Sequence, residues 1–324
     1  MSRALGWLLG AAVVAGMIVA PSQLYTGQVR VVTTVLMFVA LAQAWNIIGG
    51  LTGYACFGQV AFFGIGGYTT AVLMEHVNWS FWLALPVSAL GCAAFAALIG
   101  LPLLRLRGHY FAIATLGVAE GMREVVTNLG PLTGGGAGIT VPTVAGRGTL
   151  WLGNDGFYLL FLALAVLAVA VAALIAHSRF GYGLRAINQD EDAAASAGVN
   201  TTRAKVLALA ISAGITGLVG SAYAFQQVTI YPQRLFDVDI TVTMIVMVVI
   251  GGAGTVLGPL VGAVGLQFVS EHLRQNYPQE HILVLGAVIV LVVLLFPAGL
   301  VTVARTAVAQ RRLTLLDTIR AYRL

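Results

Sequence analysis

The chain is a series of long apolar segments, each separated from the next by a few polar or glycine-rich residues. A helix that crosses a lipid bilayer needs about 20 mostly apolar residues, with a range of about 17–25. Ten segments fit or approach this length, at residues 4–20, 31–48, 53–74, 81–104, 110–129, 157–177, 205–227, 238–252, 258–273 and 281–301. The sequence therefore predicts an all-α, polytopic membrane protein of about ten transmembrane helices in a single domain, residues 1–324.

Composition supports lipid as the solvent. Only 9% of the 324 residues are charged and 59% are apolar, whereas a soluble domain carries about 25% charged residues. The formal net charge is +5, but the basic residues lie mostly between apolar segments, as membrane topology requires. We therefore expect no nucleic-acid partner.

Positive residues orient the chain, because they are enriched in cytoplasmic connections. With a cytoplasmic N-terminus and ten helices, 12 of the 17 basic residues lie inside and five outside. The outside set is Arg30, Arg123, Arg147, Arg234 and Arg274. The prediction is that both termini are cytoplasmic, with the basic, moderately amphipathic tail 304–324 lying along lipid headgroups or contacting an ATPase.

No feature of the sequence predicts a metal, a cofactor or a catalytic site. Cys56 and Cys92 lie in apolar runs without CxxC spacing, and the five histidines do not pair at metal-ligand spacing. The glycine run 134–138 is not followed by the lysine of a phosphate-binding loop. ATP must therefore be hydrolysed by another chain if it drives this protein.

Small residues recur at four-residue spacing in Ala213/Gly217/Ser221 and in Gly258/Gly262. Such rows allow helices to approach closely in a membrane, either within one chain or between subunits. The tripeptides 48–50 and 250–252 are both Ile-Gly-Gly, and each closes a helix before a glycine-rich one. This weak internal repeat is typical of transporters, although turn chemistry alone could produce it.

The segment 178–205 is the one long polar internal connection predicted on the cytoplasmic side, and it contains three consecutive acids, Asp190, Glu191 and Asp192. Residues 184–197 are mostly helix formers, and Gly198 suits a helix stop. We expect one short surface helix with Leu184, Ile187 and Ala194 on its apolar face. Lipid headgroups are an alternative contact, but three acids beside an anionic leaflet are unfavourable, which favours a protein partner.

This segment resembles the cytoplasmic loop of bacterial ABC importer permeases, because Asp192-Ala-Ala-x-x-x-Gly198 is similar to their E-A-A-x-x-x-G motif. The wider run from Gly181 resembles branched-chain amino acid permeases of the LivM type. The resemblance implies a coupling helix that fits a cleft on the ATPase. The residues it assigns to this contact are Gly181, Leu184, Arg185, Ile187, Asp190, Glu191, Asp192, Ala193, Ala194 and Gly198.

Further blocks follow the family order at residues 53–68, 106–117, 132–135 and 251–263. The sequence departs from the family at His109, where relatives often carry an acid, and at Gln59, where a histidine is frequent. The resemblance implies a heterodimer with a second, related permease in the bacterial inner membrane. It also implies two cytoplasmic ATP-binding subunits and a periplasmic or extracellular binding protein that delivers the cargo.

Polar residues inside the predicted spans are candidates for the translocation path. Glu120, Arg123 and Glu124 can share one helix face, as a structural ion pair or as part of a gate. The glycine-rich segment that begins at Tyr54 is the other candidate, because broken helices expose backbone dipoles to a path. The candidate path residues are Tyr54, Gln59, Phe62, Phe63, Glu120, Arg123, Glu124 and Gln226.

The resemblance implies import of branched-chain or other hydrophobic amino acids. A permease for urea, short amides or other small carboxylates is the alternative within the class. An ion-coupled secondary transporter is the alternative outside it, and would need acids at the middle of the membrane and no docking loop. A membrane-embedded enzyme lacks a convincing set of catalytic residues.

Overall fold

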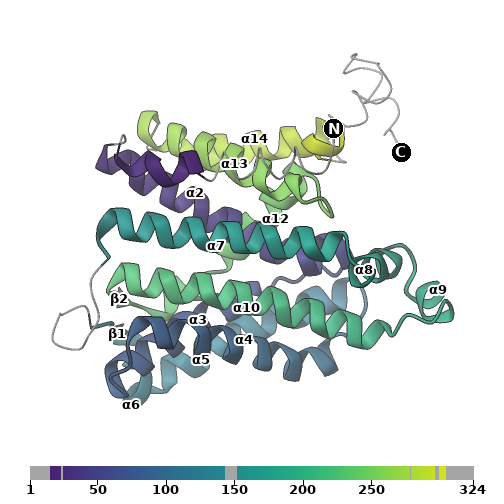
Figure 1. Cartoon of the computed structure of the whole chain (residues 1–324), viewed down its shortest axis with the longest axis horizontal. Helices are drawn as coiled ribbons and strands as arrows, with labels where there is room; N and C mark the ends of the chain where they lie inside the picture. Colours follow the sequence, from purple (N-terminus) through teal and green to yellow (C-terminus); the bar gives the residue numbers. More distant parts are fainter. Residues whose placement is uncertain (1–14, 23–24, 143–151, 278, 296–298, 304–324) are drawn as a thin grey trace.

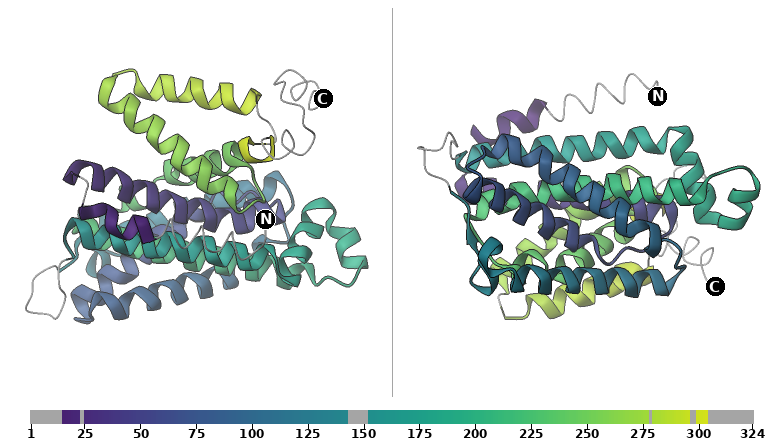
Figure 2. Two further views of the ribbon diagram at one scale, coloured as in Figure 1. Left: turned by 45° about the horizontal axis from the view of Figure 1, so that its top comes forward. Right: turned by 90° about the horizontal axis from the view of Figure 1, so that it is seen from below.

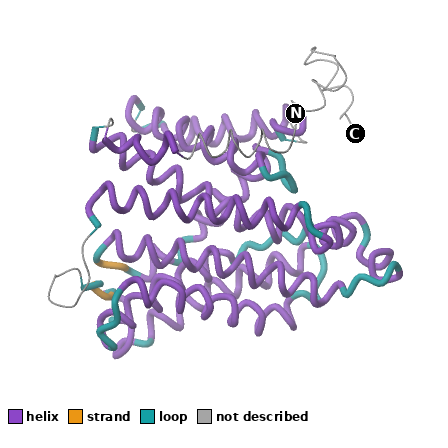
Figure 3. The backbone as a smooth tube through the Cα atoms, viewed as in Figure 1, coloured by secondary structure: helices purple, strands orange, loops and turns teal. Residues whose placement is uncertain are grey.

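The computed structural model describes all residues except 1–14, 23–24, 143–151, 278, 296–298 and 304–324 (Figure 1). Its described part is a bundle of helices with a single pair of two-residue strands, which confirms the all-α prediction. The strands lie at one end of the bundle, which we call the sheet end. Helices α8 and α9 project from the opposite end, which we call the α8–α9 end (Figures 1 and 3).

The longer helices are α2 (Thr26–Trp45), α3 (Gln59–His76), α4 (Phe81–Leu103), α5 (His109–Asn128), α7 (Gly153–Ala176), α8 (Arg179–Gln189), α10 (Thr201–Gln227), α12 (Val238–Gly251), α13 (Leu257–Asn276) and α14 (His281–Leu295). The short elements are the 3-10 turns Ala20–Ser22 and Gly135–Ala137, the π-helical turn Asn46–Gly50, α6 (Gly130–Thr133), α9 (Glu191–Ser196) and α11 (Pro232–Leu235). Strand β1 (Ile139–Thr140) pairs antiparallel with β2 (Thr229–Ile230).

Helix length decides how many elements can cross a membrane unaided. Five helical segments of the described chain are long and apolar enough: Thr26–Gly50, Phe81–Leu103, Gly153–Ala176, Thr201–Gln227 and Leu283–Val303. The predicted count of ten is not confirmed. Helix α12 has 14 residues, or about 21 Å at 1.5 Å per residue. Helix α3 begins at Gln59 and not at 53 as predicted, and most of the segment 4–20 lies outside the described residues.

Helix α10 is the centre of the fold. It packs against α2, α3, α4 and α7, while α13 and α14 form a layer over α2 and α12 (Figure 2). Its small residues allow α3 to come very close, since a Cβ at Gly220 would lie 2.0 Å from the carbonyl oxygen of Phe63. In the predicted row Ala213/Gly217/Ser221, a Cβ at Gly217 would lie 2.6 Å from the sulfur of Cys92, so the row is used for packing within the chain. Gly258/Gly262 likewise packs against α12.

The two Ile-Gly-Gly tripeptides lie at neighbouring places in the fold. The side chain of Asn46 donates to the carbonyl of Thr255 (2.9 Å) and accepts from the backbone N–H of Gly254 (2.9 Å). The π-helical turn that ends α2 is thus bonded to the turn between α12 and α13. The weak sequence repeat marks two helix ends that meet near the α8–α9 end.

Candidate functional site

Helix α8 is fixed against the end of α7 by backbone and side-chain contacts. The Ser178 side chain accepts a hydrogen bond from the N–H of Gly181 (3.1 Å), which caps the first turn. A Cβ at position 181 would lie 2.0 Å from the carbonyl oxygen of Ile175, so only glycine fits there. Arg185 donates from its guanidinium to the carbonyl of Ala176, the last residue of α7. Gly181 and Arg185 therefore hold α8 in place.

The predicted single helix over 184–197 is wrong, because the chain breaks at Asp190. Asp190 has an extended backbone (φ −160°, ψ 116°), and its carboxylate accepts from the N–H groups of Asp192 and Ala193 at 2.9 Å. It therefore ends α8 and caps α9. Leu184, Ile187 and Ala194 are all buried, but they lie on two helices and pack within the chain, so they do not form one exposed apolar face.

The rest of α9 is small and exposed. Ala193, Ala195, Ser196 and Ala197 all face solvent, and Gly198 follows in a left-handed conformation (φ +88°). Gly198 thus stops the helix as predicted. Figure 1 shows α9 at the tip of the α8–α9 end, beyond the bundle. Small side chains at such a tip leave its backbone open to the close approach of another surface.

A buried polar cluster ties α9 to the bundle. The ammonium of Lys205 is 3% exposed and donates to three acceptors: Glu191 (2.6 Å), the hydroxyl of Tyr54 (2.9 Å) and the carbonyl of Leu104 (2.9 Å). The Tyr54 hydroxyl in turn donates to the second oxygen of Glu191 (2.5 Å). All three ammonium protons are thus satisfied. We call Lys205, Glu191, Tyr54 and the Leu104 carbonyl the Lys205 cluster.

Charge, in addition to hydrogen-bond geometry, stabilises the Lys205 cluster. Burial opposes ionisation of Glu191, but hydrogen bonds from Lys205 and Tyr54 outweigh it and hold the pKa of that carboxyl below its usual range. Burial, then the bond to Glu191, raises the pKa of Tyr54 well above its usual value. On the exposed side Arg107 binds Asp192 with two hydrogen bonds (2.8 and 3.1 Å), which lower the pKa of Asp192. Both acids of α9 are therefore ionised and paired at neutral pH.

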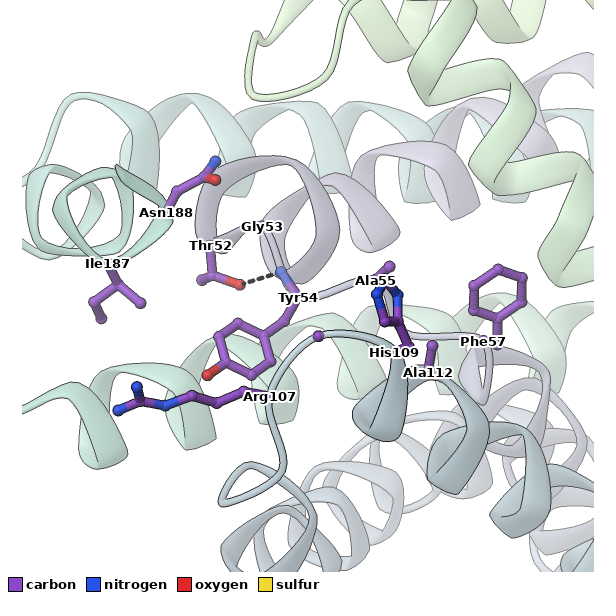
Figure 4. Close-up of a pocket in the computed structure, with 11 residues that line it drawn as sticks. Thr52, Gly53, Tyr54, Ala55, Phe57, Arg107, His109, Ala112, Ile187 and Asn188 are labelled. Carbon is purple, nitrogen blue, oxygen red and sulfur yellow. Dashed lines mark hydrogen bonds between the residues drawn. The ribbon is translucent and has the colours of Figure 1, made fainter. Parts of the chain in front are cut away.

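A cavity of about 440 Å³ lies beside this cluster, where α8 meets the break between α2 and α3 (Figure 4). Asn188 of α8 donates to the carbonyl of Gly50 (3.2 Å). Gly53 has φ +76°, and a Cβ there would lie 2.4 Å from the side-chain oxygen of Asn188. His109 also lines the cavity, together with Arg107. The α8–α9 unit thus contacts the helix break directly.

Comparison with known proteins identifies the family of the chain. A profile of the family described as branched-chain amino acid transport system / permease component matches residues 25–293. The chain belongs to this permease family. It is 33% identical over 309 residues to the high-affinity branched-chain amino acid transport system permease protein LivM of Salmonella typhimurium, covering 88% of this chain and 72% of the relative. The LivM protein of Escherichia coli is 31% identical with the same coverage.

A probable branched-chain amino acid transport permease protein LivM of Methanocaldococcus jannaschii is 27% identical over 179 residues, covering 54% of this chain and 50% of the relative. No solved structure matches the permease significantly. Family membership makes the chain a membrane-embedded transport subunit, of a kind that works with ATPase and binding-protein subunits. Its described residues contain no group of three or more His, Cys, Asp or Glu side chains able to hold a metal.

The residues predicted for the translocation path fall into separate places in the permease. Tyr54 lies in the Lys205 cluster. Gln59 is buried in the bundle and donates to Ser212 (2.8 Å) and Thr216 (2.7 Å) of α10. Phe62 packs edge-on against Phe95. Phe63 and Gln226 are brought together, because both line one cavity of about 560 Å³ at the sheet end.

The charged group on α5 is a surface feature of the permease chain. Arg123 pairs with Glu120 at 2.7 Å and approaches Glu124 at 3.6 Å, as the helical spacing predicted. Their side chains are 36%, 40% and 62% exposed in this order. The group thus forms a polar stripe on the outside of an otherwise apolar helix.

Sequence reasoning missed the roles of Lys205 and Arg107, which it used only to orient the chain. One signal was available: Lys205 is the only lysine among 17 basic residues. An ammonium is a compact point charge with three donors, whereas a guanidinium is a planar fork. A single lysine beside 16 arginines indicates a site that needs the ammonium.

Proposed function

We propose that this permease forms one half of the pore of an ATP-driven importer, and that α8 and α9 are the surface on which an ATPase subunit docks. The observation that carries the proposal is the attachment of α9 to the bundle through the Lys205 cluster. A helix held by buried charged hydrogen bonds can transmit a displacement, because breaking such a pair costs several kcal/mol. A loosely tethered loop would absorb the same displacement.

The α8–α9 end faces the cytoplasm in this proposal, in the inner membrane of a bacterium and with both termini on that side. This orientation is supported by the arginines in the two connections at the α8–α9 end, which are Arg105, Arg107, Arg179, Arg185 and Arg203. Basic residues are enriched in cytoplasmic connections. The segment 178–205 is then the docking unit. The tail 304–324, which lies outside the described residues, is proposed as a cytoplasmic segment.

Movement of α9 would reach the pore through the break between α2 and α3. Tyr54 belongs to both the Lys205 cluster and this break, and Asn188 bonds α8 to Gly50 on its other side. Backbone at membrane depth is left non-helical only where protein or a water-filled path satisfies it. Docking and release of the ATPase would thus reposition the start of α3, and with it access to the path.

A second, related permease subunit would complete the pore along α5. The polar stripe of Glu120, Arg123 and Glu124 supports this, because charged side chains on a membrane helix are unfavourable against lipid. An α5 that faces a partner subunit, and the path between the two subunits, gives these charged side chains a polar environment. A substrate-binding protein would deliver cargo at the sheet end.

The cargo we propose is a branched-chain or similar hydrophobic amino acid, as the names of the related LivM proteins indicate. Uptake of labelled leucine by cells that express the complete system tests this part. Competition by unlabelled valine and isoleucine is the expected result. Competition by urea or a short amide, without competition by these amino acids, would replace the proposed cargo.

Docking is tested by purifying the tagged permease in mild detergent from cells that express the whole system. The variants Ala193→Arg, on α9, and Ala197→Arg, at its C-terminal cap, place bulk on exposed positions without disturbing buried groups. Gln233→Arg is the matched control, because Gln233 is equally exposed but lies at the sheet end.

The wild type and the control are expected to co-purify an ATPase and a second permease, whereas the α9 variants lose the ATPase and keep the second permease. If the ATPase remains with both α9 variants, α9 is not the docking surface. If wild-type permease purifies alone and leucine uptake follows an ion gradient in cells depleted of ATP, the importer proposal is wrong.

A further inference from the structure

The cavity at the sheet end has the shape of a small-ligand site. It measures about 560 Å³ and lies between α2, α3, α7, α10 and α12, within the range of about 300–1,000 Å³ common for such sites. Met37, Phe63, Phe157 and Phe161 form its floor, and all four are buried. The floor is therefore an apolar surface suited to a short hydrocarbon group.

The rim of the cavity is polar and carries one charge. Arg30 lies on it, and none of the ion pairs or side-chain hydrogen bonds among the described residues uses its guanidinium. Gln226 also lines the cavity and likewise makes no side-chain hydrogen bond within the described part of the chain. The Tyr223 hydroxyl accepts from Gln227 (2.7 Å), which leaves its own proton available. Three donors thus face the cavity without an assigned acceptor.

The charge of the rim selects the chemistry of a ligand. No acidic residue is among the described residues that line the cavity. Arg30 also borders a second cavity of about 840 Å³ that Glu271 lines, but the Glu271 carboxylate is paired with Arg274 (2.7 Å) and not with Arg30. A guanidinium binds a carboxylate with two parallel hydrogen bonds. The amide of Gln226 can accept from an ammonium group, since its oxygen is also unpaired.

We propose that this cavity is a binding site for a small carboxylate with a short branched apolar group, in which Arg30 binds the carboxylate and the aromatic floor receives the apolar group. A branched-chain amino acid has this form, so the inference deepens the proposed function and rests on it for the identity of the cargo. Ile240 lines the cavity and also packs on Val60, Ala61 and Ala119, which join α3 to α5. One side chain therefore stands between this site and the helix that carries the polar stripe.

Protection of an introduced cysteine tests the site independently of transport. The native Cys56 and Cys92 are buried, so the variant Thr34→Cys gives a single reactive thiol at the cavity. The full complex in membranes is treated with a membrane-impermeant maleimide, with leucine or with 3-methylbutylamine, which is leucine without its carboxylate. We expect leucine to slow labelling at Thr34→Cys and the amine to have no effect.

Adding Arg30→Gln to Thr34→Cys is expected to raise the leucine concentration needed for half-protection by about tenfold or more, the loss typical of a charged hydrogen bond. Arg30→Lys, which keeps the charge, is expected to restore part of the protection. Arg234→Gln is the matched control, because Arg234 of α11 lies at the same end and is exposed but does not line the cavity. It should leave protection unchanged, and labelling of Thr140→Cys on β1 should not respond to leucine.

The outcomes separate this inference from the proposed function. If wild-type complex imports leucine but leucine does not protect Thr34→Cys, or Arg30→Gln leaves protection unaltered, the site is wrong while the function stands. If leucine is not imported yet protects Thr34→Cys through Arg30, the site stands and the cargo is wrong. If the amine protects as well as leucine, binding does not depend on a carboxylate and the inference is overturned.

Discussion

The Nζ atom of Lys205 donates hydrogen bonds to three acceptors from separate parts of the chain: the Glu191 carboxylate, the Tyr54 hydroxyl and the backbone carbonyl of Leu104. It also lies 4.5 Å from the centre of the Tyr54 ring. Few side chains can satisfy so tight a set of acceptors, because a guanidinium is larger and its donors lie in one plane. The residue therefore specifies a geometry as well as a charge.

Replacing Lys205 by methionine leaves Glu191, whose side chain is 16% exposed, as a nearly buried charge without its main partner. We expect this to lower the free energy of unfolding by about 3–5 kcal/mol, and Lys205→Arg to be destabilising too. Thermal unfolding in detergent measures both. The neighbouring exposed Arg203→Met is the control and should change little. Equal stability of the wild type and Lys205→Arg would contradict the geometric argument.

The depressed pKa of Glu191 predicts a pH dependence with a definite sign. A carboxyl whose pKa is lower in the folded state adds stability above its ordinary pKa of about 4.3 and loses it as pH falls through the folded value. Glu191→Gln should therefore be less stable than wild type at pH 5 and above. The difference in unfolding temperature should shrink below pH of about 4. A difference that stays constant down to pH of about 3 would exclude this role.

At the scale of elements, the break between α8 and α9 is set by one side chain. The run 184–197 has good helix propensity, which is why sequence reasoning predicted one helix. Asp190 nevertheless favours a cap, because its carboxylate can satisfy two backbone N–H groups at the start of a new helix. Propensity over a short window thus gave the wrong boundary, and the three apolar side chains Leu184, Ile187 and Ala194 are buried from two helices instead of one.

Asp190→Ala removes the cap and should destabilise α9 by about 1 kcal/mol. We expect faster hydrogen exchange at the amides of Asp192 and Ala193, and weaker retention of the ATPase. Asp190→Asn keeps an acceptor for both N–H groups and serves as the control. If Asp190→Ala and Asp190→Asn exchange at the same rate, the cap does not define α9.

The contact between α10 and α3 makes opposite predictions for two glycines on one helix. A Cβ at Gly220 would lie 2.0 Å from the carbonyl oxygen of Phe63, whereas at Gly214 the nearest atom is 3.5 Å away. Gly220→Ala should therefore destabilise by about 1–3 kcal/mol. Gly214→Ala should stabilise by about 0.5–1 kcal/mol, because alanine is the better helix former. Thermal unfolding of the two variants in detergent compares them, and equal effects would contradict the packing.

For the whole molecule, apolar segments predicted most helix positions within a few residues. The exceptions have a physical cause. Helix α3 begins at Gln59 because residues 53–58 are non-helical and are held by other elements. The backbone N–H of Phe57 donates to the hydroxyl of Thr115, and the indole N–H of Trp45 donates to the carbonyl of Cys56. Such contacts join residues far apart in sequence, as do those of Tyr54 and Lys205, so no local pattern reveals them.

At the scale of the whole molecule, we predict the orientation of the chain across the membrane. A cysteine at Ser196, on α9, and one at Gln233, on α11, lie at opposite ends of the bundle and are both exposed. We expect an impermeant maleimide to label Gln233→Cys in intact cells, and Ser196→Cys only after the membrane is opened. Labelling of Ser196→Cys in intact cells would show that the predicted orientation is wrong.

Since Lys205 is the only lysine in the sequence and is 3% exposed, the chain offers amine-reactive reagents no accessible side chain while the Lys205 cluster is closed. Acylation of position 205 then becomes a native reporter of conformation. Acylation of Lys205 during ATP turnover would show when the cluster opens. In a complex arrested with the cluster closed, Lys205 would not be acylated. The residue that holds the docking helix in place thus also allows its release to be followed without a foreign probe.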